Sequence, residues 1–298
     1  MPTPLSLSKT AAREQLRRMA PIRLRRPVFF VPGWRDQGGC CWTQPYVEDG
    51  ADCRPGWEYT VQDWVAQWVR PADRTQVHFV RLVEQEERLR ENPPAWEQDA
   101  TSRYENFFQF AELLKGRIRA SGIEEYDLVG HSMGGLDSIA AIILDVAVDG
   151  EPEVNAFINS PPLEGAARLI TVATPFRGSP TAELVKRTQF DELLMPNWLP
   201  GIRKQAEAMA TSSPFIHIIT SREREQRLIQ RVPGGVHTFG SYNDLVVPST
   251  HRMIAGATNH PAADFQLARH SQRLGIPQDP RLALAVFSIL SGGLHGPE

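Results

Sequence analysis

The fold is decided by the stretch Tyr126–Gly135, whose sequence is YDLVGHSMGG. A short apolar strand runs into the turn Gly130–Gly134, and a helix with apolar residues at helical spacing follows at once. A Gly-x-Ser-x-Gly turn between a strand and a helix is the form of a nucleophile elbow. Ser132 then occupies a very sharp turn, where a flanking glycine has no Cβ to collide with neighbouring backbone. The N-terminal amides of the new helix would face any negative charge that forms beside this serine.

The composition describes an ordinary folded protein and argues against several classes. Of the 298 residues, 41% are hydrophobic and 22% are charged, and the formal net charge is -3, so nothing favours nucleic acid as a partner. No run of about 18 apolar residues predicts a transmembrane helix, so we expect no stable membrane insertion. The arginine-rich start has no apolar core of signal-peptide length. We therefore expect a cytoplasmic protein, with secretion left open if a leader has been removed; no pattern indicates an oligomeric state.

Strands that alternate with helices predict an α/β fold, with a mostly parallel sheet and helices on both faces. We expect this domain over residues 27–298, interrupted by an irregular insertion at 35–60 and by a lid or cap segment at 181–212. Residues 1–26 would form a basic arm, which we interpret as a solvated, partly disordered tail; contact with anionic lipid is the alternative. In such sheets the functional groups gather at the carboxyl ends of the strands.

Short apolar runs bounded by turn residues predict the strands, and amphipathic runs predict the helices. The expected strands are Val28–Val31, Val77–Val80, the elbow strand, Arg168–Ala173, Val236–Gly240 and, last, His251–Ala255. The elbow helix has its apolar residues at Leu136, Ile139, Ala140, Ile143, Leu144 and Ala147. The other expected helices are Val61–Val69, Tyr104–Ala120 with Gly122 after its end, Pro214–Gln230, and a final helix through Leu290 that Asp279-Pro280 caps.

Ser132 needs a base, because an unassisted hydroxyl is a weak nucleophile. In the elbow arrangement the acid and then the histidine follow the serine along the chain. His270 precedes the final helix by a short loop, from which an imidazole can reach the sheet edge, and it is the favoured base. His260 is the alternative, whereas the positions of the other histidines suit this role less well: His251, His295 and, beside the serine itself, His131, which we interpret as scaffold.

Asp244 is the favoured acid, because it follows the strand Val236–Gly240 and lies between the serine and His270 in the chain. Its carboxylate would accept the second imidazole N–H and stabilise the imidazolium. The alternative interpretation is that Asp244 only forms a turn. Asp191 and Asp264 are weaker substitutes.

Two backbone amides are the candidate oxyanion donors. One belongs to Met133, directly after the nucleophile, and the other to Trp34, in the loop after the strand Val28–Val31. Negative charge that develops on a substrate oxygen during attack would be stabilised between them.

No residue pattern predicts a metal or a cofactor. The spacing of cysteines and histidines does not resemble a zinc site. An odd number of cysteines favours free thiols, although Cys40 or Cys41 could pair with Cys53. One set of large side chains could line an apolar acyl pocket or belong to the plain core: Trp42, Tyr46, Trp57, Tyr59, Met195 and Trp198.

Several segments together resemble the α/β-hydrolase superfamily, and most nearly its lipase and esterase branch. They are the elbow GHSMGG, VPGW at 31–34, ATPFRGSP at 173–180, NDLVVP at 243–248 and the segment around His270. The resemblance extends from about Pro27 to Leu290, and it implies an eight-strand-type sheet, ester hydrolysis without a cofactor, and the triad Ser132, Asp244 and His270. Pro32 and Phe176 stand where many relatives carry histidine.

The sequence thus predicts a serine carboxylic-ester hydrolase, an esterase or a lipase, that acts through an acyl-enzyme on a small-molecule or lipid ester. An acyltransferase or a thioesterase could use the same triad. A binding protein with this fold and an idle triad is the non-enzymatic alternative, and it would not react with a fluorophosphonate probe.

Overall fold

The computed structural model describes residues 4–33, 61–82, 104–187, 200–242, 244–262 and 279–292. Within these ranges six parallel strands form one sheet in the spatial order β2-β1-β3-β4-β5-β6. The strands are β1 (Val28–Val31), β2 (Val77–Phe79), β3 (Tyr126–His131), β4 (Ala166–Val172), β5 (Val236–Phe239) and β6 (Thr258–Asn259). The predicted α/β fold with a mostly parallel sheet is confirmed. The family resemblance implied an eight-strand-type sheet, whereas the part of the chain described here contains these six strands.

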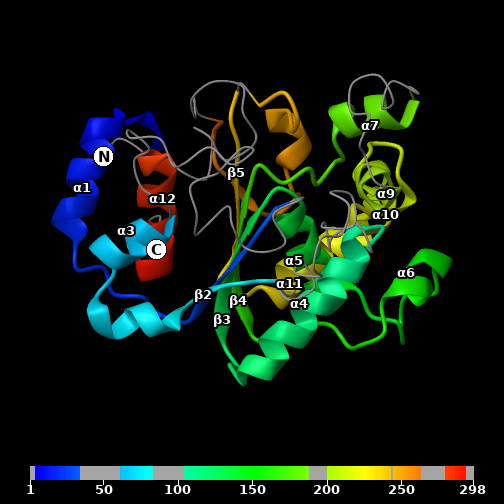
Figure 1. Cartoon of the computed structure of the whole chain (residues 1–298), viewed down its shortest axis with the longest axis horizontal. Helices are drawn as coiled ribbons and strands as arrows, with labels where there is room; N and C mark the ends of the chain where they lie inside the picture. Colours follow the sequence, from blue (N-terminus) through cyan, green and yellow to red (C-terminus); the bar gives the residue numbers. More distant parts are fainter. Residues whose placement is uncertain are drawn as a thin grey trace, which may run out of the picture.

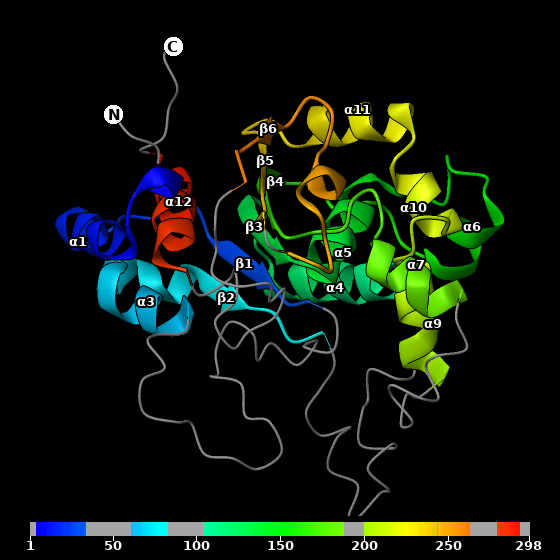
Figure 2. The same ribbon diagram turned by 90° about the horizontal axis from the view of Figure 1, so that it is seen from above.

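Helices cover both faces of the sheet (Figures 1 and 2). One face carries α1 (Lys9–Met19), α3 (Val61–Trp68) and α12 (Pro280–Ser291); the other carries α4 (Phe107–Ser121), α5 (Met133–Ile143), α10 (Pro214–Ile219) and α11 (Arg222–Arg231). Successive side chains of β1 alternate between two cores: Phe29 and Val31 pack on the α4–α5 side, and Val28 and Phe30 on the α3–α12 side. Burial on both faces explains why the strands are continuous apolar runs in the sequence.

Most predicted elements are confirmed, with ends that differ by a few residues. Asn106 caps α4 by accepting the amides of Phe108 and Gln109, and Gly122 ends it in the left-handed conformation. Asp279 caps α12, with Pro280 in the first turn. The elbow helix α5 ends at Ile143, earlier than the apolar pattern through Ala147 suggested.

The prediction of a last strand at His251–Ala255 is wrong. Ser249–Arg252 forms a short 3-10 helix, η5, and the last strand, β6, comes later and has only two residues. Gly256, at a φ of 79°, turns the chain between them, which a continuous strand would not allow.

The predicted helix Pro214–Gln230 is two helices. The first, α10, ends at Ile219, where the Thr220 hydroxyl donates to Ile216 O at 2.8 Å. Ser221 then caps α11 by accepting the Arg224 amide. Hydroxyl side chains can form hydrogen bonds with nearby backbone groups in place of the helical ones. Thr220 and Ser221 therefore separate the two helices, although the apolar residues continue at helical spacing across them.

The expectation of a solvated N-terminal tail is wrong for residues 4–26. Residues Pro4–Ser6 form a 3-10 helix, and α1 packs against α12 with Ala12 and Leu16 fully buried. Apolar residues four positions apart, Ala12 and Leu16, are the helical signal that the arginines around them obscured.

The expected lid segment, residues 181–212, has two described helical parts, α7 (Pro180–Arg187) and α9 (Pro200–Ala208), which pack on each other. Its two ends are joined: Glu183 Oε2 accepts bonds from Thr211 Oγ1, Ser212 N and Ser212 Oγ at 3.0, 2.9 and 2.8 Å. Residues 188–199 and the insertion at 35–60 lie outside the described ranges. The domain division and the lid therefore stay predictions.

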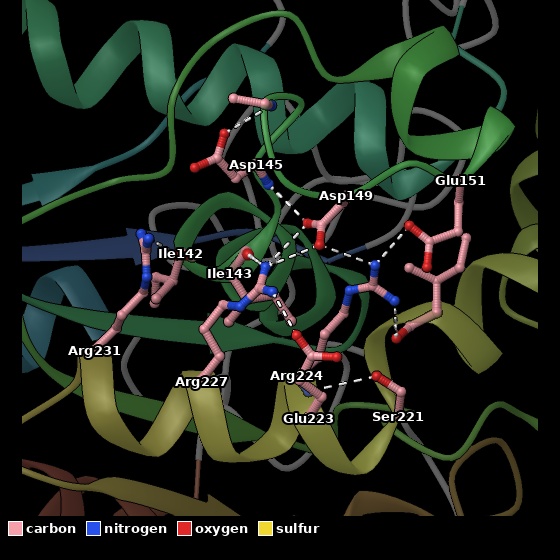
Figure 3. A network of polar contacts seen from close by, with 12 residues as sticks. Ile142, Ile143, Asp145, Asp149, Glu151, Ser221, Glu223, Arg224, Arg227 and Arg231 are labelled. Carbon is pink, nitrogen blue, oxygen red and sulfur yellow. Dashed lines mark hydrogen bonds and ion pairs between the residues drawn. The ribbon is translucent and has the colours of Figure 1, made fainter.

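Arginines of α11 hold the C-terminal end of α5 (Figure 3). Arg227 Nη1 donates to Ile143 O at 3.0 Å, and Arg231 Nη1 donates to Ile142 O at 3.1 Å. The last carbonyls of a helix have no donor within the helix, and a cation there also opposes the negative end of the helix dipole. The helix that begins next to Ser132 is thus anchored at its far end.

Candidate active site

Ser132 lies in a strained turn between β3 and α5. Its φ of 53° and ψ of -126° are unusual for a residue with a Cβ. The turn is held from both sides, because Ser132 N donates to Val172 O at 2.8 Å and Gly135 N donates to Ser132 O at 3.0 Å. Backbone strain that the surroundings enforce is typical of functional positions.

The glycines around the serine are required by close backbone packing. A Cβ built on Gly130 would lie 2.7 Å from Gly134 O, and one on Gly134 would lie 2.2 Å from Pro32 O. A Cβ on Gly135 would lie 2.0 Å from Thr174 Oγ1. The start of α5 is therefore packed directly on the ends of β1 and β4, which confirms the reason given for glycine at these positions.

Met133 is the first residue of α5, and its side chain is fully buried. The amides of the first helical turn have no acceptor within the helix and lie at the positive end of its dipole. The backbone next to Ser132 is thus suited to stabilise negative charge.

The loop after β1 lies against the serine. A Cβ built on Gly33 would come within 3.0 Å of Ser132 Cβ and 2.9 Å of His131 Nδ1. Val31 pairs with Gly130 in the register of β1 and β3, so the two loops leave the sheet side by side. Trp34, the predicted second oxyanion donor, lies outside the described residues.

Asp244 follows β5 and is buried, with 4% of its surface exposed. Its Oδ1 accepts the amides of Val246 and Val247, both at 2.9 Å. The same loop is tied to the segment after β4, since Ser179 Oγ donates to Val246 O and Thr181 Oγ1 to Leu245 O, at 2.6 and 2.8 Å. Asp244 therefore lies in a fixed loop at the carboxyl end of β5.

The favoured base, His270, lies outside the described residues, as do His295, Asp191 and Asp264. The alternative His260 is engaged in the sheet: its ring stacks on Phe239 with centroids 4.1 Å apart, and its Nε2 lies 3.2 Å from His237 Nδ1. Burial, His237 and Arg252 lower the pKa of His260 to about 4. These contacts favour a structural role for His260.

Two further histidines near the strand ends, His251 and His131, contact neighbouring loops. His251 Nδ1 lies 2.8 Å from Gly178 O, which connects η5 to the loop after β4. His131 is the last residue of β3 and is buried, with Gly33 packed against its ring. This surrounding supports its interpretation as scaffold.

Two groups of predicted features fall outside the described ranges: the cysteines Cys40, Cys41 and Cys53, and the pocket candidates Trp42, Tyr46, Trp57, Tyr59, Met195 and Trp198. Within those ranges no three His, Cys, Asp or Glu side chains are grouped so that they could hold a metal ion. No helix there is long and apolar enough to cross a membrane.

Arg252 is a buried residue that no sequence pattern indicates. It has no motif around it, and its position at the end of β5 depends on η5, where the sequence pattern predicts a strand instead. Ala173, at a φ of 49° after β4, is a second strained position that no sequence pattern indicated.

Comparison with known proteins identifies the fold. No protein-family model matches the chain, and no curated protein sequence matches it significantly. Among solved structures it matches the Bacillus licheniformis lipase BlEst2 in its propeptide form, with a TM-score of 0.51 and 16% identity over 92% of this chain and 52% of that one. The chain thus spans about half the length of that protein.

The mature form of the same lipase matches with a TM-score of 0.49 and 16% identity, over 89% of this chain and 91% of that one. A metagenomic carboxyl esterase, MGS0156, matches with a TM-score of 0.48 and 14% identity, over 91% and 76% of the two chains. Together with the parallel sheet and the elbow, the likeness to the propeptide form shows that this chain has the α/β-hydrolase fold. That prediction is confirmed.

Proposed function

We propose that this protein is a serine carboxylic-ester hydrolase with Ser132 as its nucleophile. The observation that carries the proposal is the Ser132 backbone, held at positive φ between β3 and α5 by glycines packed on neighbouring backbone. Such a conformation costs about 1–3 kcal/mol, which a purely structural turn could avoid with glycine at that position. Esterases and lipases among the structures of this fold agree with the proposal but do not carry it.

In the proposed reaction Ser132 Oγ attacks the ester carbonyl carbon while His270 accepts the hydroxyl proton. His270 returns this proton to the leaving alcohol, and an acyl-enzyme forms. A water molecule then attacks the acyl carbon and gives a proton to His270. The bond between the acyl carbon and Ser132 Oγ breaks, Ser132 Oγ takes the proton back from His270, and the carboxylic acid leaves. Asp244 would hold the imidazole and stabilise its charged form; its burial in a fixed loop supports this role.

The oxyanion would bind the amides of Met133 and Trp34. The position of Met133 at the start of α5 supports the first assignment. The packing of Gly33 against Ser132 supports the second, because Trp34 follows Gly33 directly in the chain.

The test is hydrolysis of p-nitrophenyl acetate and butyrate by the purified protein and by Ser132→Ala. We expect the variant to lose about 10⁴-fold or more in kcat and to lose labelling by a fluorophosphonate probe. Ser138→Ala is the matched control, because Ser138 is also buried on α5 but donates only to Gly134 O, at 2.7 Å. Equal activity of Ser132→Ala and the parent protein would overturn the proposal.

A series of p-nitrophenyl esters with longer acyl chains then separates an esterase from a lipase. Preference for short chains indicates an esterase, whereas preference for long chains with activation at an oil–water interface indicates a lipase. Addition of an alcohol or use of a thioester substrate reveals acyl transfer or thioester hydrolysis on the same residues.

A further inference from the structure

Arg252 is a buried arginine between the two strand ends that lead to the proposed acid and the proposed base. Only 3% of its surface is exposed. Its Nη1 donates to Thr238 O at 3.0 Å and to Thr238 Oγ1 at 2.7 Å, and its Nη2 donates to His260 O. Thr238 is part of β5, and His260 follows β6 directly. One guanidinium group therefore joins the ends of both strands.

The stem of the same side chain packs on Gly240, which opens the loop that contains Asp244. A Cβ built on Gly240 would lie 2.2 Å from Arg252 Cδ and 2.5 Å from its Nε. A side chain at position 240 would collide with Arg252, so glycine lets the backbone after β5 pass close to the arginine. The acid loop thus starts on the surface of Arg252.

The polar network extends from Arg252 to β6. Thr238 Oγ1 donates to Asn259 Oδ1 at 2.9 Å, and the same Oδ1 accepts the Ile254 amide at 3.1 Å. Asn259 Nδ2 donates back to Ile254 O at 2.9 Å. β5, β6 and the turn after η5 are therefore linked into one unit by side chains, and Arg252 is the charged member of that network.

No carboxylate in the described part of the chain forms an ion pair with Arg252. Burial of a charged group without a counter-ion is costly, so this arginine is a poor choice for stability alone. What it offers is a planar fork of donors that reaches several oxygens in fixed directions. The arrangement favours a role in which Arg252 fixes the relative positions of the backbone segments that it binds.

We propose that Arg252 is a positioning residue that fixes the start of the loop of Asp244 relative to the end of β6, so that the carboxylate is held where the proposed reaction needs it. The proposal rests on the proposed function, because it assumes that Asp244 acts as the acid. Arg252 itself does not touch the substrate in this reaction; it acts through the loop of Asp244 and the end of β6.

The test compares Arg252→Lys with Arg224→Lys in hydrolysis of p-nitrophenyl butyrate. Lysine keeps the charge but cannot span Thr238 and His260 with one planar group. We expect kcat of Arg252→Lys to fall about 10- to 100-fold, with KM within about twofold, and its labelling by a fluorophosphonate probe to slow in parallel. Arg224 is buried to a similar degree, with 7% of its surface exposed, and it is bonded to Ile218 O, Glu151 and Asp149 instead of to the ends of β5 and β6. Arg224→Lys should therefore lower the melting temperature without lowering kcat.

Thr238→Val is measured alongside, because it removes the hydroxyl that accepts from Arg252 and donates to Asn259 but keeps the Thr238 carbonyl that Arg252 also binds. It would decide the question if Arg252→Lys did not fold. Its kcat should fall about fivefold at unchanged KM. Unchanged kcat in the folded Arg252 and Thr238 variants overturns this inference alone. A parent protein that neither hydrolyses the ester nor reacts with the probe overturns the proposed function, and this inference with it.

Discussion

Asp244 Oδ1 accepts the backbone N–H of Val247 at 2.9 Å, and it accepts that of Val246 at the same distance. Bonds from a carboxylate to amides two and three residues later stabilise a turn, which is the role that the non-catalytic interpretation assigned to this residue. In the proposed reaction the same carboxylate also holds His270. The two roles can be separated, because asparagine offers the same Oδ1 acceptor without the negative charge.

Asp244→Asn should therefore keep the turn and lose the catalysis. We expect a melting temperature within about 2 °C of the parent protein, since both amide bonds are retained. The kcat for p-nitrophenyl butyrate should fall about 10⁴-fold, because a neutral amide does not stabilise the imidazolium. Asp244→Ala, the control, should lose both the turn and the catalytic activity. Full activity of Asp244→Asn would leave Asp244 as a turn former only.

Gly33→Ala should lower activity more than stability. The new Cβ would lie 3.0 Å from Ser132 Cβ and 3.2 Å from His131 O, so the loop and the elbow would have to separate. A displacement of this kind near the reacting atoms costs about 10- to 100-fold in kcat. Gly116→Ala is the control: this glycine lies within α4 with nothing within 4 Å of a new Cβ, so the same change should leave kcat unaltered and raise stability. Ester hydrolysis and thermal unfolding of both variants test the difference.

The sheet was predictable from the sequence because each of its central strands is buried on both faces. Phe29 and Phe30 must both be apolar when they point into opposite cores, so β1 is a continuous apolar run. The edge strand β6 has only two residues, and its place is set by the Asn259 network and the turn at Gly256, which involve no hydrophobic pattern. Long-range packing likewise determines the position of α1, which packs against α12 through two apolar residues that lie among arginines in the sequence.

The candidate site was predictable where local backbone geometry determines the residue types. The elbow needs glycine beside Ser132, and that requirement is visible in the motif. The contact between Gly33 and Ser132, or between Arg252 and Gly240, joins segments far apart in the chain, and no local pattern contains it. Such contacts can be found only once the strands have been placed side by side.

Asp149→Asn should make the protein less stable at neutral pH. Burial alone would raise the pKa of Asp149, but the Asp145 amide, Arg227 and Arg224 outweigh it and hold the pKa below its usual value. Arg227 Nη1 lies 3.0 Å from Asp149 Oδ1, and Arg224 Nη2 lies 3.1 Å from it. Without the Asp149 carboxylate, the largely buried Arg224 and Arg227 have less negative charge beside them. We expect the free energy of unfolding to fall by about 3 kcal/mol.

The pH dependence of this effect follows from the lowered pKa. The carboxylate stabilises the fold above its unfolded pKa, and the contribution is lost as the pH falls through the folded pKa. Urea unfolding should therefore show a larger difference between Asp149→Asn and the parent protein at pH 7 than near pH 3. Glu223→Gln is the control, since Glu223 binds the same Arg227 from a side chain that is 81% exposed; its effect should stay within about 0.5 kcal/mol. Equal losses for the two variants would contradict the prediction.

Asp137→Asn should have the opposite pH dependence. Asp137 lies on α5 and is fully buried, neither carboxylate oxygen has a hydrogen-bond partner among the described residues, and burial raises its pKa well above the usual value. The folded state therefore binds a proton more tightly than the unfolded state, and stability falls as the pH rises above the unfolded pKa. Asparagine removes the titration at nearly the same size. We expect Asp137→Asn to be more stable than the parent protein by at least about 1 kcal/mol at pH 8, with a smaller gain at pH 5, in urea unfolding. Some pH dependence in the same sense should persist in the variant, because burial, opposed by Arg168, raises the pKa of Asp127 to about 6. A loss of stability at pH 8 would mean that the ionised carboxylate is needed in α5.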